Sequence, residues 1–175
     1  MTKILVIITT ELVQYGGLAS VMLNYYRSMN RKNFQIDFAS TNEIDEELKT
    51  EFHFCNTKYY NLGKRKNILR YIYNLMNVVR KEKYDIVHVN GNSSTMVLEL
   101  LASKAGGVKR IIAHGHAARS SYPIIHKLLH PVFCCLYTDA IAVSKKTGDW
   151  LFKDEYHILN NAIDTEKYSF NQELR

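Results

Sequence analysis

Two histidines separated by one glycine, His114 and His116, are the residues whose types and spacing most suggest chemistry. They directly follow the apolar segment 109–113, a position that core packing explains poorly. An imidazole pair can bind a metal, but no Cys, Asp or Glu lies close in sequence to complete a ligand set. It can also serve acid–base catalysis, or recognise a sugar or phosphate with Arg119 as a nearby cation. No activated serine or cysteine accompanies the pair, so a hydrolase is not indicated.

A glycine pair, Gly16 and Gly17, suggests phosphate binding. It lies between an apolar segment at residues 3–9 and a helical pattern at residues 18–30. Glycine lacks a Cβ, so a ligand can approach the backbone, and the first turn of a helix offers unpaired N–H groups to an anion. Paired glycines also serve turns alone, and this spacing differs from the dinucleotide fingerprint G-x-G-x-x-G. The sequence leaves both interpretations open.

Other polar residues follow predicted strands. Asn90 and Asn92 come after residues 85–89, and Ser144 comes after residues 139–143. Ser144 also precedes a helical pattern, so we expect its hydroxyl to cap that helix. His88 lies inside a predicted strand, where a hydrogen-bonded core histidine is expected.

A parallel sheet is needed to bring these residues together. Apolar, β-branched segments predict buried strands at residues 3–9, 34–39, 85–89, 109–113 and 139–143, with a weaker strand at 157–159 and an edge strand near 57–60. Helical patterns alternate with them at residues 18–30, 66–82, 93–105, 122–136 and 145–152, with an acidic helix or turn near 43–51. This alternation predicts an α/β fold with a doubly wound, mostly parallel, Rossmann-like sheet. Ligands bind beyond the carboxyl ends of such strands.

Two predicted helices have surfaces that suggest a partner. Basic residues at 64–66 and 80–83 bracket the amphipathic pattern at 66–82, for which core packing with solvated ends is favoured over contact with a membrane surface. Residues 120–137 are apolar over a wide arc. We expect a helix buried against the sheet there, and the wall of a lipid-binding groove is the alternative.

Length and composition fit one layered domain of 175 residues with 46% hydrophobic residues. No apolar run is long enough to span a membrane and no secretory signal is evident, so we expect a cytoplasmic protein. The net charge of +6 favours an anionic partner such as a nucleotide phosphate or anionic lipid. No RNA-recognition motif is present, so no nucleic acid is expected as a partner. Cys55, Cys134 and Cys135 lack metal-ligand spacing and are expected to be reduced and mostly buried.

In order, these pieces resemble the N-terminal domain of a retaining glycosyltransferase with the GT-B architecture, of the family 4-like group that includes capsular and exopolysaccharide enzymes. The resemblance spans nearly the whole chain. It rests on five motifs: Tyr15-Gly16-Gly17, Tyr84-Asp-Ile-Val-His-Val-Asn90, Lys109-Arg-Ile-Ile-Ala-His-Gly-His116, Asp139-Ala-Ile-Ala-Val-Ser144, and Tyr156-His-Ile-Leu-Asn-Asn-Ala-Ile-Asp164 followed by Lys167-Tyr-Ser-Phe170. The last resembles the stretch that leads into the second domain, although Asn160 and Ala162 replace its usual proline and glycine.

The resemblance implies a role for each candidate residue. His114, with His116 close behind, would be catalytic and face the transferring sugar, and Gly16 and Gly17 would place backbone donors near the donor diphosphate. The acceptor cleft would be lined by Asn90, Asn92, Arg119 and Ser144. Transfer would proceed with retention by front-face displacement, aided by stabilising the departing diphosphate. No metal or other cofactor is implied, because the nucleotide-sugar is a substrate.

The resemblance also implies a partner domain. In this family the C-terminal domain supplies most of the nucleotide-sugar site, and the chain stops at Arg175 before such a domain. We therefore expect an acceptor-side domain at residues 1–160, the start of an interdomain linker at residues 161–175, and little or no sugar transfer by this domain alone.

The leading prediction is the acceptor-binding domain of a hexosyltransferase that moves a sugar from a UDP-sugar to a polysaccharide or lipid-linked acceptor. Residues 66–82 or 120–137 would make peripheral contact with the inner face of the membrane. The alternative is a free-standing nucleotide- or phosphate-binding module, or an accessory subunit without catalysis of its own. Titration with UDP separates the two, since a module should bind UDP tightly alone and a half-enzyme weakly.

Overall fold

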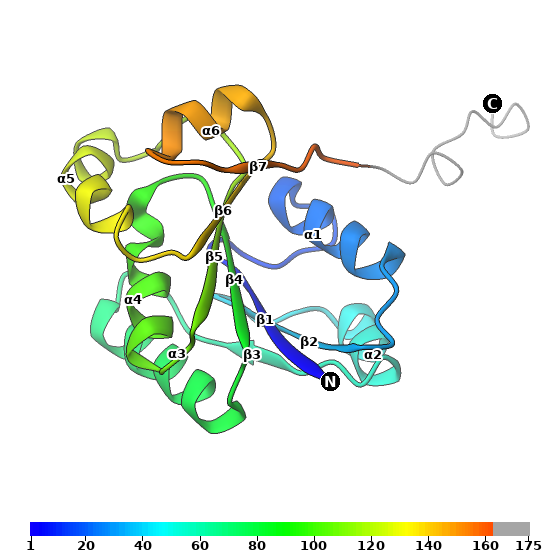
Figure 1. Cartoon of the computed structure of the whole chain (residues 1–175). Helices are drawn as coiled ribbons and strands as arrows, with labels where there is room; N and C mark the ends of the chain where they lie inside the picture. Colours follow the sequence, from blue (N-terminus) through cyan, green and yellow to red (C-terminus); the bar gives the residue numbers. More distant parts are fainter. Residues whose placement is uncertain (163–175) are drawn as a thin grey trace, which may run out of the picture.

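A computed structural model describes residues 1–162 of the chain. Its strands form one parallel sheet in the order β3-β2-β1-β4-β5-β6-β7 (Figure 1). They are β1 (Thr2–Ile8), β2 (Phe34–Ser40), β3 (Tyr59–Asn61), β4 (Ile86–Gly91), β5 (Arg110–Gly115), β6 (Asp139–Ala142) and β7 (His157–Ile158). This confirms the predicted fold class, including the weaker strand and the edge strand.

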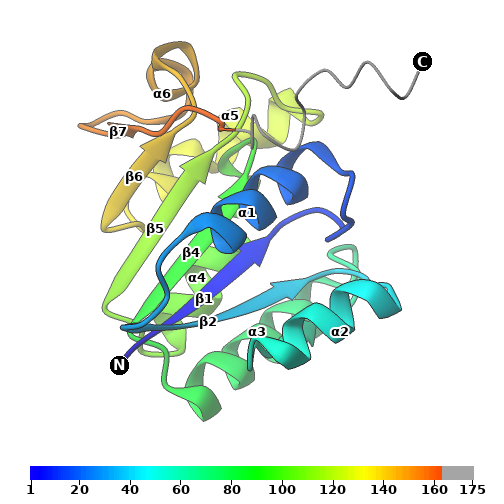
Figure 2. The ribbon, with the colours of Figure 1, turned by 90° about the vertical axis from the view of Figure 1, so that its right-hand side faces the viewer.

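Helices cover both faces of the sheet. Helices α1 and α2 lie on one face, whereas α3, α4 and α5 lie on the other (Figures 1 and 2). The bounds are α1 (Gly17–Ser28), α2 (Glu46–Phe54), α3 (Ile68–Glu82), α4 (Val97–Ala105), α5 (Pro123–Phe133) and α6 (Lys145–Leu151), with a short 3₁₀ turn η1 (Ser94–Met96) before α4. The acidic segment near residues 43–51 is therefore a helix, α2.

Burial on both faces explains the unbroken apolar sequence of β1. Leu5 and Ile7 belong to the core shared with α3 and α4, whereas Val6 and Ile8 belong to the core shared with α1 and α2. Because successive side chains of a strand point to opposite faces, a strand covered on both sides needs apolar residues at every position.

The strand register brings the candidate loops to one edge of the sheet. Ile8 is paired with Asn90, and Asn90 is paired with His114. On the far side of β5, Gly115 is paired with Ala142. The loops that follow β1, β4, β5 and β6 therefore leave the sheet at its carboxyl edge, as the sequence predicted.

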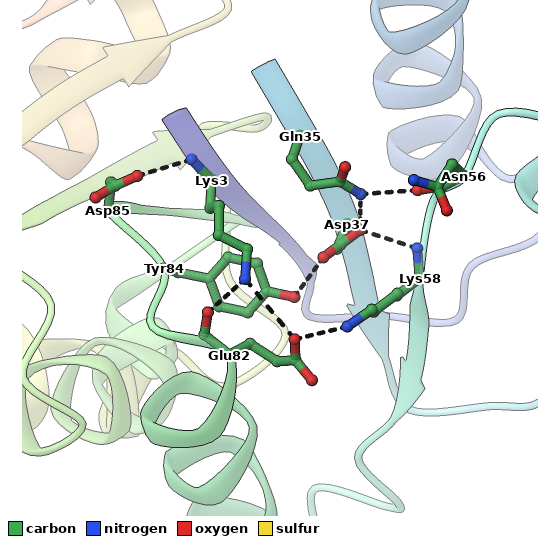
Figure 3. Close-up of polar contacts among 8 residues, drawn as sticks. All are labelled: Lys3, Gln35, Asp37, Asn56, Lys58, Glu82, Tyr84 and Asp85. Carbon is green, nitrogen blue, oxygen red and sulfur yellow. Dashed lines mark hydrogen bonds and ion pairs between the residues drawn. The ribbon is translucent and has the colours of Figure 1, made fainter. Parts of the chain in front are cut away.

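A polar network joins the sheet to α3 near the amino ends of β1, β3 and β4 (Figure 3). Asp37 has no exposed surface and accepts hydrogen bonds from the Tyr84 hydroxyl (2.7 Å), the Lys58 backbone N–H (2.9 Å) and the Gln35 side-chain amide (2.9 Å). The Lys58 ammonium forms an ion pair with Glu82 at 2.7 Å. We call the cluster of Gln35, Asp37, Lys58, Glu82, Tyr84 and Lys3 the Asp37 network; each of these side chains has a partner, whereas the hydroxyl of the neighbouring Tyr60 is buried without one.

Helix α5 differs from the sequence prediction. We expected residues 120–137 to be buried, but Phe133 is the only buried residue of α5, and Ile124 and Leu128 are 82% and 75% exposed. The prediction of core burial is therefore wrong, because α5 packs through one side only. Cys135 is also exposed, which corrects the expectation of mostly buried thiols; all three cysteines are free.

Two further predictions concern helices and domain bounds. Helix α3 packs against the sheet through Tyr71, Leu75 and Val79, so the core-facing interpretation of residues 66–82 is confirmed. Of the linker expected at residues 161–175, all but the first two residues lie outside the described residues. Among residues 1–162, no helix has the length and apolar character required to cross a bilayer.

Candidate functional site

The glycine turn presents the amino end of α1 without any cap. Gly16 is the N-cap residue and has no side chain to bond the first turn. The first N–H of this turn with a partner is that of Ser20, which donates to the Gly16 carbonyl at 2.7 Å. Within residues 1–162, no acceptor is bonded to the N–H groups of residues 17–19. Three donors and the positive end of the helix dipole are thus available to an anion.

The two glycines of this turn differ in their surroundings. A Cβ at Gly16 would lie 2.6 Å from Val13 Cγ2, whereas a Cβ at Gly17 would meet no atom within 4 Å. A cleft of about 480 Å³ lies over the turn and is bordered by both glycines together with Thr10 and Thr41. Gly17 therefore leaves open space at the point where α1 offers its N–H groups.

Three histidines form a row across β4 and β5. His88 Nε2 lies 3.2 Å from His114 Nδ1, and the two rings are stacked with centroids 5.2 Å apart. The ring of His116 follows, with its centroid 4.1 Å from that of His114. Its Nε2 lies 3.0 Å from Asn90 Oδ1. We call His88, His114 and His116 the histidine row.

The Asn90 amide fixes the tautomer of His116. Its Nδ2 donates to the carbonyls of Ile7 (3.3 Å) and His88 (3.1 Å), so its Oδ1 is the acceptor that faces His116. The proton of the neutral imidazole is then on Nε2, and Nδ1 carries a lone pair. Among the described residues, His116 Nδ1 and His114 Nε2 are buried without a hydrogen-bond partner. Such atoms cost stability unless a ligand or water bonds them.

All three imidazoles are neutral at physiological pH. Burial lowers the pKa of His88 to about 3, that of His114 to about 2 and that of His116 to about 4. The neighbouring histidines lower the pKa of His88 and His114 further, because a second positive charge nearby is unfavourable. The row therefore suits hydrogen bonding to neutral hydroxyl groups better than charge pairing with phosphate.

The predicted site residues differ in how exposed they are and in how close they lie to the cleft. Gly17 borders the open cleft. Strand β1, which precedes Gly17, and strand β5, which carries His114, are separated in the sheet only by β4. His114 and Asn90 have no exposed surface, whereas His116 is partly exposed and Asn92 is exposed. Asn90 therefore anchors His116 from below the surface.

Ser144 and Arg119 lie at the same edge. The Ser144 hydroxyl accepts a hydrogen bond from the Thr147 N–H at 3.2 Å and caps α6, as its position predicted. Arg119 is exposed in the loop between β5 and α5, and no hydrogen bond or ion pair holds it within residues 1–162. Of the two, Arg119 is the side chain available to a ligand.

Sequence reasoning identified His88 as a bonded core residue but missed that its partner is His114. The available signal was the alternation of side chains along a strand: His88 and Asn90 face one side of β4, and His114 faces one side of β5, with His116 directly after the end of that strand. Placing these strands beside each other would have predicted the row. Within residues 1–162, no group of three or more His, Cys, Asp or Glu side chains is arranged to hold a metal ion.

This fold is that of one half of a GT-B enzyme. The chain superposes on MurG of Acinetobacter baumannii with a TM-score of 0.65 at 13% identity, over 91% of this chain and 45% of that one. It superposes on the lipopolysaccharide outer core galactosyltransferase WaaB with a TM-score of 0.60 at 16% identity, over 89% of this chain and 45% of that one.

Sequence comparison gives the family. The model of Glycosyltransferase Family 4 matches residues 15–167, and the chain belongs to this family. A relative from Escherichia coli, a UDP-Gal:alpha-D-GlcNAc-diphosphoundecaprenol alpha-1,3-galactosyltransferase, is 24% identical over 172 residues, which is 88% of this chain and 43% of the relative. The chain thus spans less than half the length of this relative.

Proposed function

We propose that this chain is the acceptor-side domain of a retaining hexosyltransferase that moves a sugar from a UDP-sugar to a polysaccharide or lipid-linked acceptor. Family membership supports sugar transfer. The E. coli relative uses UDP-Gal and a diphosphoundecaprenol acceptor, which supports this donor class and a lipid-linked acceptor. A role in capsule or exopolysaccharide synthesis, and a cytoplasmic location with peripheral contact at the inner face of the membrane, belong to the same proposal.

One observation carries the proposal: the uncapped end of α1 and the unpartnered imidazole nitrogens lie at the same edge of the sheet. The α1 N–H groups would bind the donor diphosphate and stabilise the charge that develops on it as the sugar leaves. His114 and His116 would bond sugar hydroxyls, since neutral imidazoles can donate and accept. Asn92 and Arg119 would contact the acceptor, and Asn90 and Ser144 would act through the residues they hold.

A second domain would complete the donor site. Because α1 supplies only some of the hydrogen-bond donors that a diphosphate needs, we expect this chain alone to bind UDP weakly and to transfer little sugar. Tight binding of UDP by the isolated chain would instead favour a free-standing nucleotide- or phosphate-binding module.

The test uses Gly17. Gly17→Glu places a carboxylate at the amino end of α1, where it stabilises the helix but repels a diphosphate. We expect it to abolish the NMR shifts that UDP causes in residues 16–19. The methyl group added by Gly17→Ala enters open space and the backbone keeps every N–H, so this variant should change the affinity for UDP less than about threefold. Equal binding by the Glu variant would contradict this role for α1.

A further inference from the structure

The histidine row belongs to a chain of hydrogen bonds in which one end is fixed by Asn90. The Asn90 side-chain amide donates to the carbonyls of Ile7 and His88, so its Oδ1 accepts the proton of His116 Nε2. The backbone N–H of His116 also donates to the Gly91 carbonyl at 3.0 Å, which holds this residue beside β4. His116 therefore presents an Nδ1 without a proton, which can accept a hydrogen bond but cannot donate one.

At the other end of the row, two arrangements of the protons satisfy the bond between His88 and His114. His88 Nε2 lies 3.2 Å from His114 Nδ1, and one of these two nitrogens carries the proton between them. If His114 donates, neutral His114 has no proton on Nε2, and His88 carries its own proton on Nδ1. If His88 donates, His114 carries its proton on Nε2. The arrangements therefore differ in what His114 Nε2 offers a ligand, a lone pair in the first and an N–H in the second.

The surroundings of His88 favour the second arrangement. His88 borders a groove of about 410 Å³ whose other lining residues are mostly apolar, among them Met22, Phe38 and Leu159. Within residues 1–162, no acceptor is bonded to His88 Nδ1. A proton on this nitrogen would thus be an unpaired N–H, and unpaired N–H groups are rarer in proteins than acceptors with a free lone pair. His88 therefore donates through Nε2, and His114 carries its proton on Nε2.

We propose that Asn90 and His88 are positioning residues that orient the protons of the histidine row, so that one sugar hydroxyl completes it. The hydroxyl donates to His116 Nδ1 and accepts from the N–H of His114 Nε2. Within residues 1–162 these two nitrogens are buried without partners, and the ring centroids lie 4.1 Å apart, a separation at which one oxygen can contact both rings. Every hydrogen bond from His88 to Asn90 then runs in one direction, and bonds in such a chain strengthen one another.

This orientation of the protons selects a group that both donates and accepts. A phosphate oxygen only accepts, so it would face the lone pair of His116 Nδ1, and an ammonium group only donates, so it would face the N–H of His114 Nε2. A hydroxyl satisfies both nitrogens, and the partial exposure of His116 gives it access to the row. The inference rests on the proposed function and adds the two residues that determine which chemical group the row accepts.

Nitrogen NMR of the imidazole rings tests the proton positions in the 175-residue chain without any ligand. Ring nitrogens with and without a proton give well-separated signals. We expect His88, His114 and His116 all to carry the proton on Nε2 and to have none on Nδ1. A proton on Nδ1 of His114 or of His116 in most molecules would overturn the proposal.

Two variants test the positioning residues. His88→Phe keeps a ring beside the apolar groove but removes the donor to His114, and Asn90→Ala removes the acceptor of His116. Each should raise the Nδ1–H form of the histidine it no longer holds about tenfold, because the lost hydrogen bond favours the other form. Asn92→Ala is the matched control, since it removes an exposed asparagine of the same loop, and it should leave all three tautomers unchanged. If Asn90→Ala does not fold, His88→Phe still decides, and unchanged tautomers in His88→Phe would overturn the proposal.

UDP-galactose, compared with UDP, tests the hydroxyl; the E. coli relative uses this donor. UDP-galactose should shift the signals of His114 Nε2 and His116 Nδ1, and UDP should not. Backbone shifts in residues 16–19 report diphosphate binding separately. Shifts there with both imidazole signals unmoved would sink only this inference, because the sugar is then bonded elsewhere or a water already completes the row. Imidazole shifts alone would sink only the role of α1, and no shift at either place would overturn both.

Discussion

The Asp37 network and the histidine row are both buried polar clusters, but they differ in how completely their members are bonded. The Asp37 carboxylate accepts three hydrogen bonds, and Glu82 is held between two lysines. In the histidine row, His114 Nε2 and His116 Nδ1 have no partner within residues 1–162. A buried polar cluster whose bonds are complete stabilises the fold, whereas an incomplete one costs stability and is best explained by a ligand.

The largest effect is expected at Asp37. Asp37→Ala would remove the acceptor of the Tyr84 hydroxyl, the Lys58 N–H and the Gln35 amide, and leaving buried donors unpaired should lower the free energy of unfolding by about 5 kcal/mol. Asp37→Asn keeps one carbonyl oxygen and the side-chain volume, so it should cost less than half as much. Urea unfolding of the chain measures both. Equal, small losses would show that this network is not a structural anchor.

Acidification should act mainly on the histidine row. Folding lowers the pKa of His88, His114 and His116 from 6.5 to about 3, 2 and 4, so below pH 6.5 the unfolded chain binds protons that the folded chain does not. Their contribution to stability is present above that pH and is lost as the pH falls. We expect a loss of about 4 kcal/mol between about pH 7.5 and about pH 5.5, because each of the three groups contributes about 1.4 kcal/mol over that interval.

Urea unfolding at a series of pH values measures this loss. His126, whose pKa burial also lowers, adds to it in the same direction. The carboxylates of Glu82 and Asp139 have lowered pKa values, so their contributions are lost only near or below pH 4. A stability that stays constant down to about pH 5.5 would mean that the row is solvated or already bonded.

The difference between the clusters also marks what could be predicted from sequence. The strands were predictable because both faces of the sheet are covered, which forces unbroken apolar runs such as residues 3–9. Ser144 was predictable as a cap because capping depends on neighbours in sequence. The pairing of His88 with His114 depends on which strands are adjacent, and sequence spacing does not report that. Helix α5 was mispredicted because apolar residues on every side indicate burial in a core as well as contact with an external partner.

His114→Phe should separate stability from activity. The substitution keeps a ring of similar size, removes an unpartnered nitrogen and loses one bond to His88, so stability should change by no more than about 1 kcal/mol. In the enzyme that carries this domain, sugar transfer should fall at least about a hundredfold. The control is His126→Phe on α5: Ser94 donates to His126 Nδ1 from its N–H (3.2 Å), and its hydroxyl lies 2.9 Å from the same atom. That variant should lose stability and retain activity, and the reverse pattern would remove His114 from the site.

The smallest change in the free energy of unfolding is expected at Gly17, and its sign tests whether the turn requires a glycine at this position. Gly17 does not have a positive φ, and a Cβ would meet nothing within 4 Å, so folding does not require glycine at this position. Gly17→Ala should therefore raise the free energy of unfolding by about 0.5 kcal/mol, measurable as a small rise in melting temperature. At Gly16 the added Cβ would lie 2.6 Å from Val13, so Gly16→Ala should give no gain. If Gly17→Ala is stabilising, the turn itself does not require glycine at position 17; a destabilising result would assign both glycines to the turn alone.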